Sequence, residues 1–364
     1  YQEKVMDKDL TTSLQHLSKN KNRKLIDNVT QENNKNSSII PVGSNGLVRV
    51  GNSIEVTNKI LSEFKKRELE RIHFKGNLFN EIQEIGSIRT ISAVSDNEFQ
   101  IATNEESSIA KYDALNKIVK EKIKFNGHFE FVAFDNVSNS VAIASGKTIY
   151  ITSNGSGQII QKLEGHTREI NILTFSKDGK QLFSGSSDKT IRIWETESWQ
   201  CANILEGHEW LVNSLKLTSD NKYLYSGGWD AFIIKWDLQT FKEVDRFNSG
   251  NIGGIKCLEL TNDDKLIISG GGDKIVRIFN SSNFKIVAEL NGHTDFVSCL
   301  SVSNDGKLLA SGGWDGQIFI WFFSEQELIN SCQAHTGRIN AIKFSNDGKY
   351  LMSGCSDKLL KCWI

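Results

Sequence analysis

One pattern repeats along most of the chain, and this repeat constrains the fold more than any other feature. Four histidines each precede a tryptophan by 28 residues, and an Asn–Phe pair keeps the same spacing in a fifth, weaker copy. The five copies cover residues 165–194, 207–236, 250–279, 292–321 and 334–363, so their closing aromatic residues are 42 or 43 positions apart. A unit that recurs at a fixed period buries its apolar face by stacking on its neighbours.

Each copy divides into short strands separated by turn signals. In the first strong copy, ILTF and QLFSG flank a Lys-Asp-Gly turn, and TIRIW follows after Ser-Asp-Lys. The Asp-Gly pairs at 178–179, 305–306 and 347–348 predict hairpins, because glycine adopts a positive φ without steric cost. A fourth strand, such as WQCANIL, precedes the next copy. Four strands in about 40–45 residues are typical of one blade of a β-propeller.

Two degenerate copies upstream bring the number of blades to seven. Their closing positions are Tyr112 and Thr152, ahead of those at 194, 236, 279, 321 and 363. The last copy ends without a fourth strand, whereas NLFNEIQEI at 77–85 has the character of that strand. Pairing the two would leave no open sheet edge. The sequence therefore predicts an all-β, seven-bladed β-propeller over residues 77–364, closed by its own N-terminal outer strand.

Over these residues the sequence resembles the Trp-Asp repeat family, whose blades carry a hydrogen-bonded tetrad of His, Ser, Asp and Trp. The resemblance implies four complete tetrads: His166, Ser184, Asp188 and Trp194; His208, Ser226, Asp230 and Trp236; His293, Ser311, Asp315 and Trp321; His335, Ser353, Asp357 and Trp363. The fifth blade keeps Ser269 and Asp273 but has Asn251 and Phe279, so we expect an incomplete network there. The first two blades lack the tetrad and are expected to be the looser part of the ring.

Ser, His and Asp together also raise the possibility of a hydrolase. A nucleophilic triad needs one exposed serine beside an oxyanion hole and a substrate pocket. Here the same residue types recur four times at one spacing, which is typical of a structural element. The sequence also has no P-loop, no dinucleotide-binding glycine fingerprint and no G-x-S-x-G elbow. We therefore expect no catalytic residue, no metal site and no cofactor.

Three tryptophans outside the closing positions suggest where a partner binds. Trp229 and Trp314 directly precede tetrad aspartates, and Trp210 follows His208 by two residues. The family resemblance places these positions on the top face, around the central channel, and aromatic residues are frequent interface anchors. Arg168 and Asp295 occupy the position of Trp210 in the third and sixth blades, and are expected to form a charged rim. The alternative is that the rings only pack against neighbouring loops.

The residues before the propeller differ from it in composition. Residues 1–54 are polar and rich in Lys, Asn and Ser, which predicts a largely disordered region. Residues 55–76 are expected to form an amphipathic helix and a linker, with Val56, Ile60 and Phe64 on the apolar side. Three roles stay open for this helix: packing on the propeller, joining a coiled coil with a partner, or continuing an upstream domain.

Composition narrows the class of partner and compartment. The 364 residues carry a net charge of −1, which argues against a general nucleic-acid binder. No segment approaches the roughly 18 apolar residues of a membrane span. The six cysteines form no C-x-x-C pair and are expected to be buried thiols, which favours an intracellular, cytoplasmic protein. The chain begins with Tyr1 rather than Met, so no targeting signal can be judged from that end.

Three functional classes remain at this stage. The leading one is a non-enzymatic scaffold or adaptor subunit that binds other proteins on the top face of the propeller. The part of the partner that binds there is expected to be a peptide or a loop. The second is the substrate receptor of a ubiquitin ligase, although Trp236-Asp237 is followed by Leu238-Gln239 rather than by the Trp-Asp-x-Arg of some such receptors. The third is a signalling subunit similar to a G-protein β subunit, for which the N-terminal helix is a poor coiled coil. The sequence leaves the oligomeric state open.

Overall fold

The computed structural model describes residues 38–41, 47–50, 76–82, 86–104, 107–125, 128–135, 137–153, 157–323 and 325–364. The chain separates into two units, Tyr1–His73 and Phe74–Ile364. In the first, β1 (Ser38–Pro41) pairs antiparallel with β2 (Leu47–Val50). This hairpin lies inside the segment that was predicted to be largely disordered, and no pattern in the sequence indicated it. The helix expected within residues 55–76 lies outside the described residues.

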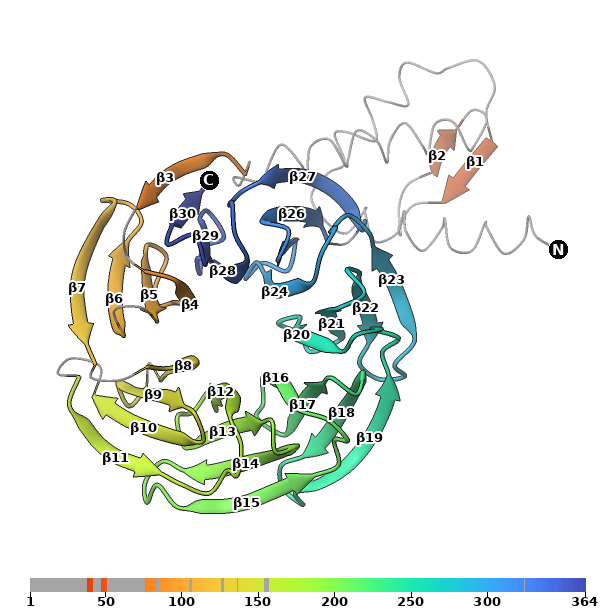
Figure 1. The fold of residues 1–364 in the computed structure, drawn as a ribbon. Helices are drawn as coiled ribbons and strands as arrows, with labels where there is room; N and C mark the ends of the chain where they lie inside the picture. The colour runs from red at the N-terminus through yellow and green to blue at the C-terminus, as the bar shows by residue number, and fades with distance from the viewer. Residues whose placement is uncertain are drawn as a thin grey trace. The chain divides into compact units, whose positions relative to one another are not determined.

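The second unit is a ring of seven four-stranded antiparallel sheets, which confirms the predicted propeller (Figure 1). The innermost strands are β4 (Ile88–Ala93), β8 (Phe131–Asp135), β12 (Ile170–Phe175), β16 (Val212–Leu217), β20 (Ile255–Leu260), β24 (Val297–Val302) and β28 (Ile339–Phe344). The second strands are β5 (Glu98–Thr103), β9 (Ser140–Ser145), β13 (Gln181–Ser186), β17 (Tyr223–Gly228), β21 (Leu266–Gly271), β25 (Leu308–Gly313) and β29 (Leu351–Cys355).

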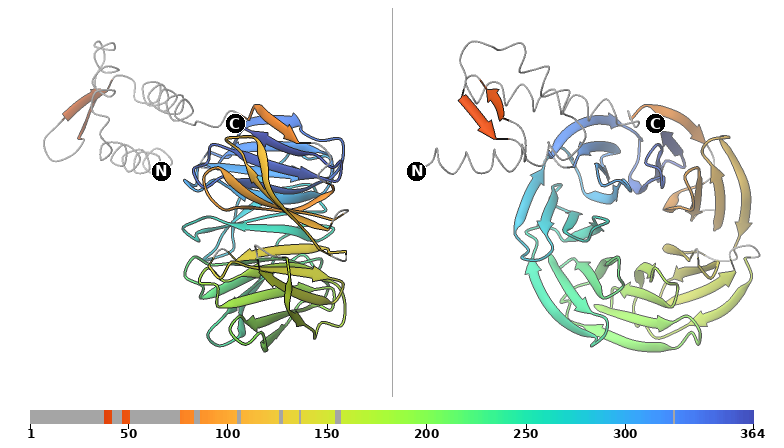
Figure 2. Two further views of the ribbon diagram at one scale, coloured as in Figure 1. Left: turned by 90° about the vertical axis from the view of Figure 1, so that its left-hand side faces the viewer. Right: turned by 180° about the vertical axis from the view of Figure 1, so that it is seen from behind.

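The outer half of each blade completes the sheet. The third strands are β6 (Ser108–Asp113), β10 (Thr148–Ser153), β14 (Thr190–Glu195), β18 (Phe232–Asp237), β22 (Val276–Asn280), β26 (Gln317–Phe322) and β30 (Leu360–Trp363). The outermost strands are β7 (Ile118–Lys124), β11 (Ile159–Leu163), β15 (Cys201–Glu206), β19 (Lys242–Asn248), β23 (Ile286–Leu290), β27 (Glu327–Gln333) and β3 (Leu78–Ile82). Figure 2 shows the same ring from its edge and from behind.

The hairpin turns fall where the Asp-Gly pairs predicted them. Gly179, Gly306 and Gly348 have φ of 69°, 71° and 73° and lie in the turns from the innermost to the second strand of their blades. Side chains carrying a Cβ adopt this backbone region at a cost, so glycine suits the turn.

The first and last blades are joined by β3, as the sequence predicted. β3 pairs antiparallel with β30, with Leu78 opposite Trp363 and Ile82 opposite Leu360. A pair of backbone hydrogen bonds between Asn77 and Ile364, of 3.0 and 2.9 Å, extends this pairing. The side chain of Asn80 also donates to the hydroxyl of Tyr112 in the first blade, at 3.0 Å. β3 therefore ties the seventh blade to the first through both backbone and side chain.

Apolar packing between adjacent blades forms the core. The closing aromatic residue of a blade packs against the blade before it: Trp194 lies in a cluster with Ala133 and Ile149, and Trp236 lies with Phe183 and Ile191. A cluster of this kind joins the seventh and first blades through Met352, Leu360 and Tyr112. All six cysteines are free thiols, and four of them are buried. At these boundaries the closing aromatic residue packs against two blades, which explains its recurrence at the blade period.

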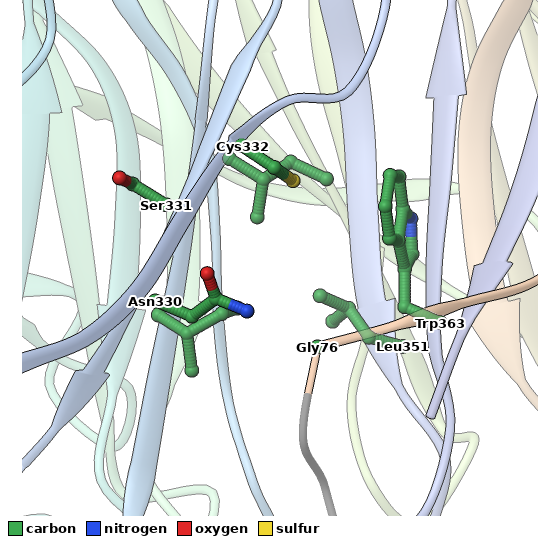
Figure 3. A pocket seen from close by; sticks show the side chains of 8 residues that line it. Gly76, Asn330, Ser331, Cys332, Leu351 and Trp363 are labelled. Atoms are coloured by element: carbon green, nitrogen blue, oxygen red, sulfur yellow. The ribbon is translucent and has the colours of Figure 1, made fainter.

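A small cavity remains between the sixth and seventh blades (Figure 3). Its walls include Asn330 and Cys332 on one side, with Leu351, Trp363 and Gly76 on the other. The volume is about 10 Å³. That is room for about one water molecule, so this cavity is a packing defect and holds no larger ligand.

Candidate functional site

We call the face formed by the loops that lead into the innermost strands the top face. The loops between the second and third strands reach the same end of the blades, because neighbouring strands in each blade are antiparallel. The two sets of loops carry the tetrad histidines and aspartates respectively. They also carry Trp210, Trp229 and Trp314.

The tetrad of the third blade is a continuous chain of hydrogen bonds. Nδ1 of His166 lies 2.7 Å from a carboxylate oxygen of Asp188, and Nε2 lies 2.8 Å from Oγ of Ser184. The indole N–H of Trp194 donates to the same Oγ at 2.9 Å. The fourth, sixth and seventh blades show the same bonds, with Oγ to Nε2 distances of 2.7, 3.0 and 2.8 Å. In these three blades the indole N–H donates to Oγ at 2.8, 3.3 and 2.9 Å.

These bonds have the connectivity of a catalytic triad, but the serines are inaccessible. Ser184, Ser226, Ser311 and Ser353 have no exposed surface. Each Oγ accepts a hydrogen bond from the indole N–H, so one of its lone pairs is engaged. A nucleophile must reach a substrate carbonyl next to an oxyanion hole. None of these four serines meets that requirement, and the network satisfies polar groups inside the blade.

The fifth blade has a different network at the same place. Nδ2 of Asn251 donates to Asp273 at 2.9 Å, while Oγ of Ser269 donates to Oδ1 of Asn251 at 2.8 Å. Phe279 offers no N–H, so the last link is missing, as expected. The guanidinium of Arg277 instead forms an ion pair with Asp273, and its Nε donates to Glu289 at 2.6 Å. Asn251 therefore takes the place of the histidine, and both Asp273 and Ser269 keep a hydrogen bond to it.

Three of the four buried side-chain polar atoms that have no partner among the described residues lie in the first two blades; the fourth is Nε of Arg192 in the third blade. The hydroxyl of Thr152, at the closing position of the second blade, is fully buried and has no hydrogen-bond partner among the described residues. The same holds for Oγ1 of Thr90 and Oε1 of Gln100 in the first blade. An unsatisfied buried polar atom costs about 1–3 kcal/mol. The idea that these two blades are looser stays a prediction.

One group of described side chains has donor atoms close enough to hold a metal ion. Those of His335, Cys355 and Asp357 lie within 4.8 Å of one another. Both ring nitrogens of His335 are already bonded, to Ser353 and Asp357. The sulfur of Cys355 accepts the backbone N–H of Asp357 at 3.3 Å. The group fits a tetrad better than a metal site.

The tetrad carboxylates are held ionised. Burial alone raises the pKa of Asp188, but hydrogen bonds from His166, Thr190 and the backbone of Thr167 outweigh it and hold the pKa well below its usual range. The pKa values of the three other tetrad aspartates are lowered as well, against the effect of burial. Burial also lowers the pKa of His335, which keeps this ring neutral.

These shifts predict that the propeller loses stability in two stages as the pH falls. Below about pH 6.5 the unfolded chain protonates His335 more readily than the folded chain does, and below about pH 4 the same holds for the tetrad aspartates. Both effects lower the free energy of unfolding. Thermal unfolding measured from pH 7.5 to 3 should show both stages. His335→Asn, which copies Asn251 of the fifth blade, should weaken the first stage; a parent melting temperature constant from pH 7 to 5 would contradict the prediction.

The structure separates the five residues predicted to bind a partner into several environments. Trp210 and Arg168 line one hollow of about 590 Å³ between the third and fourth blades. Trp314 lines the mouth of the central channel instead. Trp229 is 44% exposed and packs closely on Gly254. A Cβ added to Gly254 would lie 2.6 Å from the Cα of Trp229. Asp295 is half-buried and accepts the backbone N–H of Phe296.

Exposure also differs among the three tryptophans. Trp210 is 59% exposed, whereas Trp314 is half-buried. The ring of Trp314 stacks on Phe296, with centroids 4.6 Å apart, and the guanidinium of Arg338 lies 4.2 Å from its centroid on a cation–π contact. The ring of Trp314 therefore packs against neighbouring loops, which was the alternative to a role in partner binding.

The top face has one more apolar residue that the sequence patterns did not single out. Ile252, in the loop of the fifth blade next to Asn251, is 82% exposed. The equivalent positions in the four strong copies hold Thr167, Glu209, Thr294 and Thr336. The apolar Ile252, at a position that is polar in the four strong copies, is the sequence signal that could have identified this exposed residue.

The repeats match a known family. A family model described as WD domain, G-beta repeat matches residues 157–195, 199–237, 242–280, 284–321 and 326–363. These segments cover more than half of the chain. The chain belongs to this family. A search of curated proteins finds no match.

The matched WD repeats and the blades are offset by one strand. The repeat at 199–237 contains β15 of the third blade and β16, β17 and β18 of the fourth. Each WD repeat therefore spans two blades, so repeats interlock around the ring. Members of this family are generally non-catalytic scaffolds for protein interaction. Among the described residues, no helix is long and apolar enough to cross a membrane.

Proposed function

We propose that this WD-repeat propeller is a non-enzymatic scaffold or adaptor subunit that binds other proteins on its top face. The observation that carries the proposal is the exposure of large apolar side chains in adjacent top-face loops. Trp210 and Trp229 of the fourth blade are 59% and 44% exposed, and Ile252 of the fifth is 82% exposed. Exposed tryptophan is typical of interface anchors, because burial of its large ring stabilises a complex.

The surroundings of these side chains support a polar rim around an apolar centre. Arg168, Glu169 and Lys189 line the hollow beside Trp210. Protein interfaces commonly combine a desolvated aromatic centre with such charged borders. A peptide or a loop of a partner could contact the fourth and fifth blades together, since Trp229 already packs on Gly254.

The test replaces the two exposed rings while leaving the packed one intact. A Trp210→Ala, Trp229→Ala double variant should lose its main partner in a quantitative pull-down from cell extract, because anchor tryptophans contribute about 2 kcal/mol or more each. Its melting temperature should stay close to that of the parent. Trp314 is left in place because its ring packs on Phe296.

A matched control removes exposed apolar side chains from elsewhere. Val244 and Ile286 lie on outermost strands and are 53% and 55% exposed, so a Val244→Ala, Ile286→Ala variant should keep the partner. If the tryptophan variant folds and retains every protein that the parent captures, the top face is not the binding site. If the tryptophan variant unfolds, the rings are packing residues.

A further inference from the structure

A ring of seven side chains surrounds the central channel near the top face, one from each blade. In six blades it is the bulged residue of the innermost strand, which the pairing with the second strand skips: Arg89, Asn171, Asn213, Lys256, Ser298 and Asn340. In the second blade Glu130 takes the corresponding place, directly before β8. All seven line one cavity of about 400 Å³. We call them the bulge ring.

The neutral members of the bulge ring connect neighbouring blades. The side chain of Asn171 donates to the carbonyl of Val212, the first residue of the next innermost strand, at 3.1 Å. Asn213 donates to Ile255 in the same way at 3.2 Å, and Asn340 to Ile88 at 2.9 Å. Ser298 donates to the carbonyl of Ile339. These four side chains are therefore engaged in holding the ring together.

The charged members interrupt this pattern. At the boundary between the fifth and sixth blades, the carbonyl of Val297 faces the thiol of Cys257 at 3.6 Å, instead of the side chain of Lys256. Within the described part of the chain, the ammonium of Lys256 makes no hydrogen bond and no ion pair. Glu130 forms no ion pair with it among the described residues; the charge of this carboxylate acts on Arg89, whose pKa it raises against the effect of burial.

The electrostatic surroundings of Lys256 are unfavourable for a cation. Burial lowers its pKa, and the like charge of Arg89 acts in the same direction. The cavity lining holds four cationic side chains, those of Arg89, Lys216, Lys256 and Arg338, against the single carboxylate of Glu130. Lys216 is neutralised by Glu259 at 3.0 Å. The lining is thus cationic, although the whole chain has a net charge of only −1.

We propose that Lys256 and Arg89 form a binding site for a multiply charged oxyanion, bearing phosphate or carboxylate groups, in the mouth of the central channel. An anion there would supply the counter-charge that Lys256 lacks. A channel with walls of low dielectric concentrates the field of such charges and favours the entry of an anion. The oxyanion comes either as a free polyanion or as acidic side chains of a bound protein segment.

Isothermal titration calorimetry at low ionic strength tests the site, with tripolyphosphate in one arm and a hexaglutamate peptide in the other. At least one should bind the parent with a stoichiometry of one. Lys256→Gln and Arg89→Gln should each weaken that binding at least tenfold. Lys285→Gln removes an exposed lysine before the outermost strand of the same blade, and should bind as the parent does. Binding of tripolyphosphate but not of the peptide would show that the ligand is a free anion. Binding of the peptide would show that the ligand is an acidic segment of a protein partner.

The melting temperature of the ligand-free variants provides an independent readout. Lys256→Gln should melt at or above the temperature of the parent, because it removes a cation that has no counter-charge. The proposal is wrong if neither probe binds, or if all three variants bind as the parent does. It is also wrong if Lys256→Gln melts well below the parent, which would show that this lysine stabilises the empty channel.

Discussion

Replacing Phe79 and Ile82 together by alanine is expected to lower the free energy of unfolding of the propeller by about 3–5 kcal/mol. Both side chains are half-buried and pack on the cluster that joins the seventh and first blades. Phe79 also contacts Tyr350, with ring centroids 5.7 Å apart. Truncating one fully buried Ile or Phe costs about 2–5 kcal/mol. Because Phe79 and Ile82 are only half-buried, we expect their combined loss to lie near the lower end of twice this range.

The loss should spread beyond the two side chains. β3 is the only partner of β30 besides β29 in this sheet, and β30 has just four residues. A weakened β3 would expose the edge of β30, which is then free to pair with other chains. Urea denaturation measures the loss of stability, and light scattering measures the oligomers that an open edge produces.

Leu78→Ala is the control for this prediction. Leu78 belongs to the same strand and lies opposite Trp363, but it is 50% exposed. Its truncation should cost well under half as much as the double substitution. Equal losses in the two variants would show that the half-buried side chains contribute no more than the exposed one. No loss in either would show that β3 contributes through its backbone pairing with β30 alone.

The seven blades were predictable because local signals repeat in register. Asp-Gly turns, the closing aromatic residues and the tetrads each recur at the blade period, so an error in one copy is corrected by the others. The closing strand was predictable because the last copy is one strand short and residues 77–85 supply an unassigned one. Repetition thus compensated for the weakness of each separate signal, even in the two degenerate blades.

Features that depend on contacts between blades were not predictable in the same way. The sequence placed Trp314 beside Trp229 as an equivalent residue, but the stacking on Phe296 and the contact with Arg338 of the next blade bury it in part. The bulge ring was missed for a similar reason. A bulge is defined by which residue the pairing skips, and no residue type at these positions is shared by all seven blades.

Asp188→Ala is expected to lower the free energy of unfolding by about 1–3 kcal/mol, the cost of leaving buried donors without their acceptor. The carboxylate accepts from His166 at 2.7 Å and from the backbone of Thr167 at 3.0 Å through one oxygen. Through the other it accepts from the backbone and the hydroxyl of Thr190, at 3.0 and 2.7 Å. The corresponding substitutions of Asp230, Asp315 and Asp357 should have effects of similar size.

Asp178→Ala serves as the control, because that aspartate is exposed and its hydrogen bonds to other described residues, from Ser176 and Lys180, stay within its own turn. Chemical denaturation of the five variants should therefore separate the four tetrad substitutions from the turn substitution. Unfolding curves that coincide with the parent for all four would show that the network contributes nothing to stability. A serine-reactive fluorophosphonate should label neither the parent nor the variants at Ser184, Ser226, Ser311 or Ser353. Labelling of one of these serines in the folded parent would mean that a triad opens to solvent, and the hydrolase interpretation would then replace the structural one for that blade.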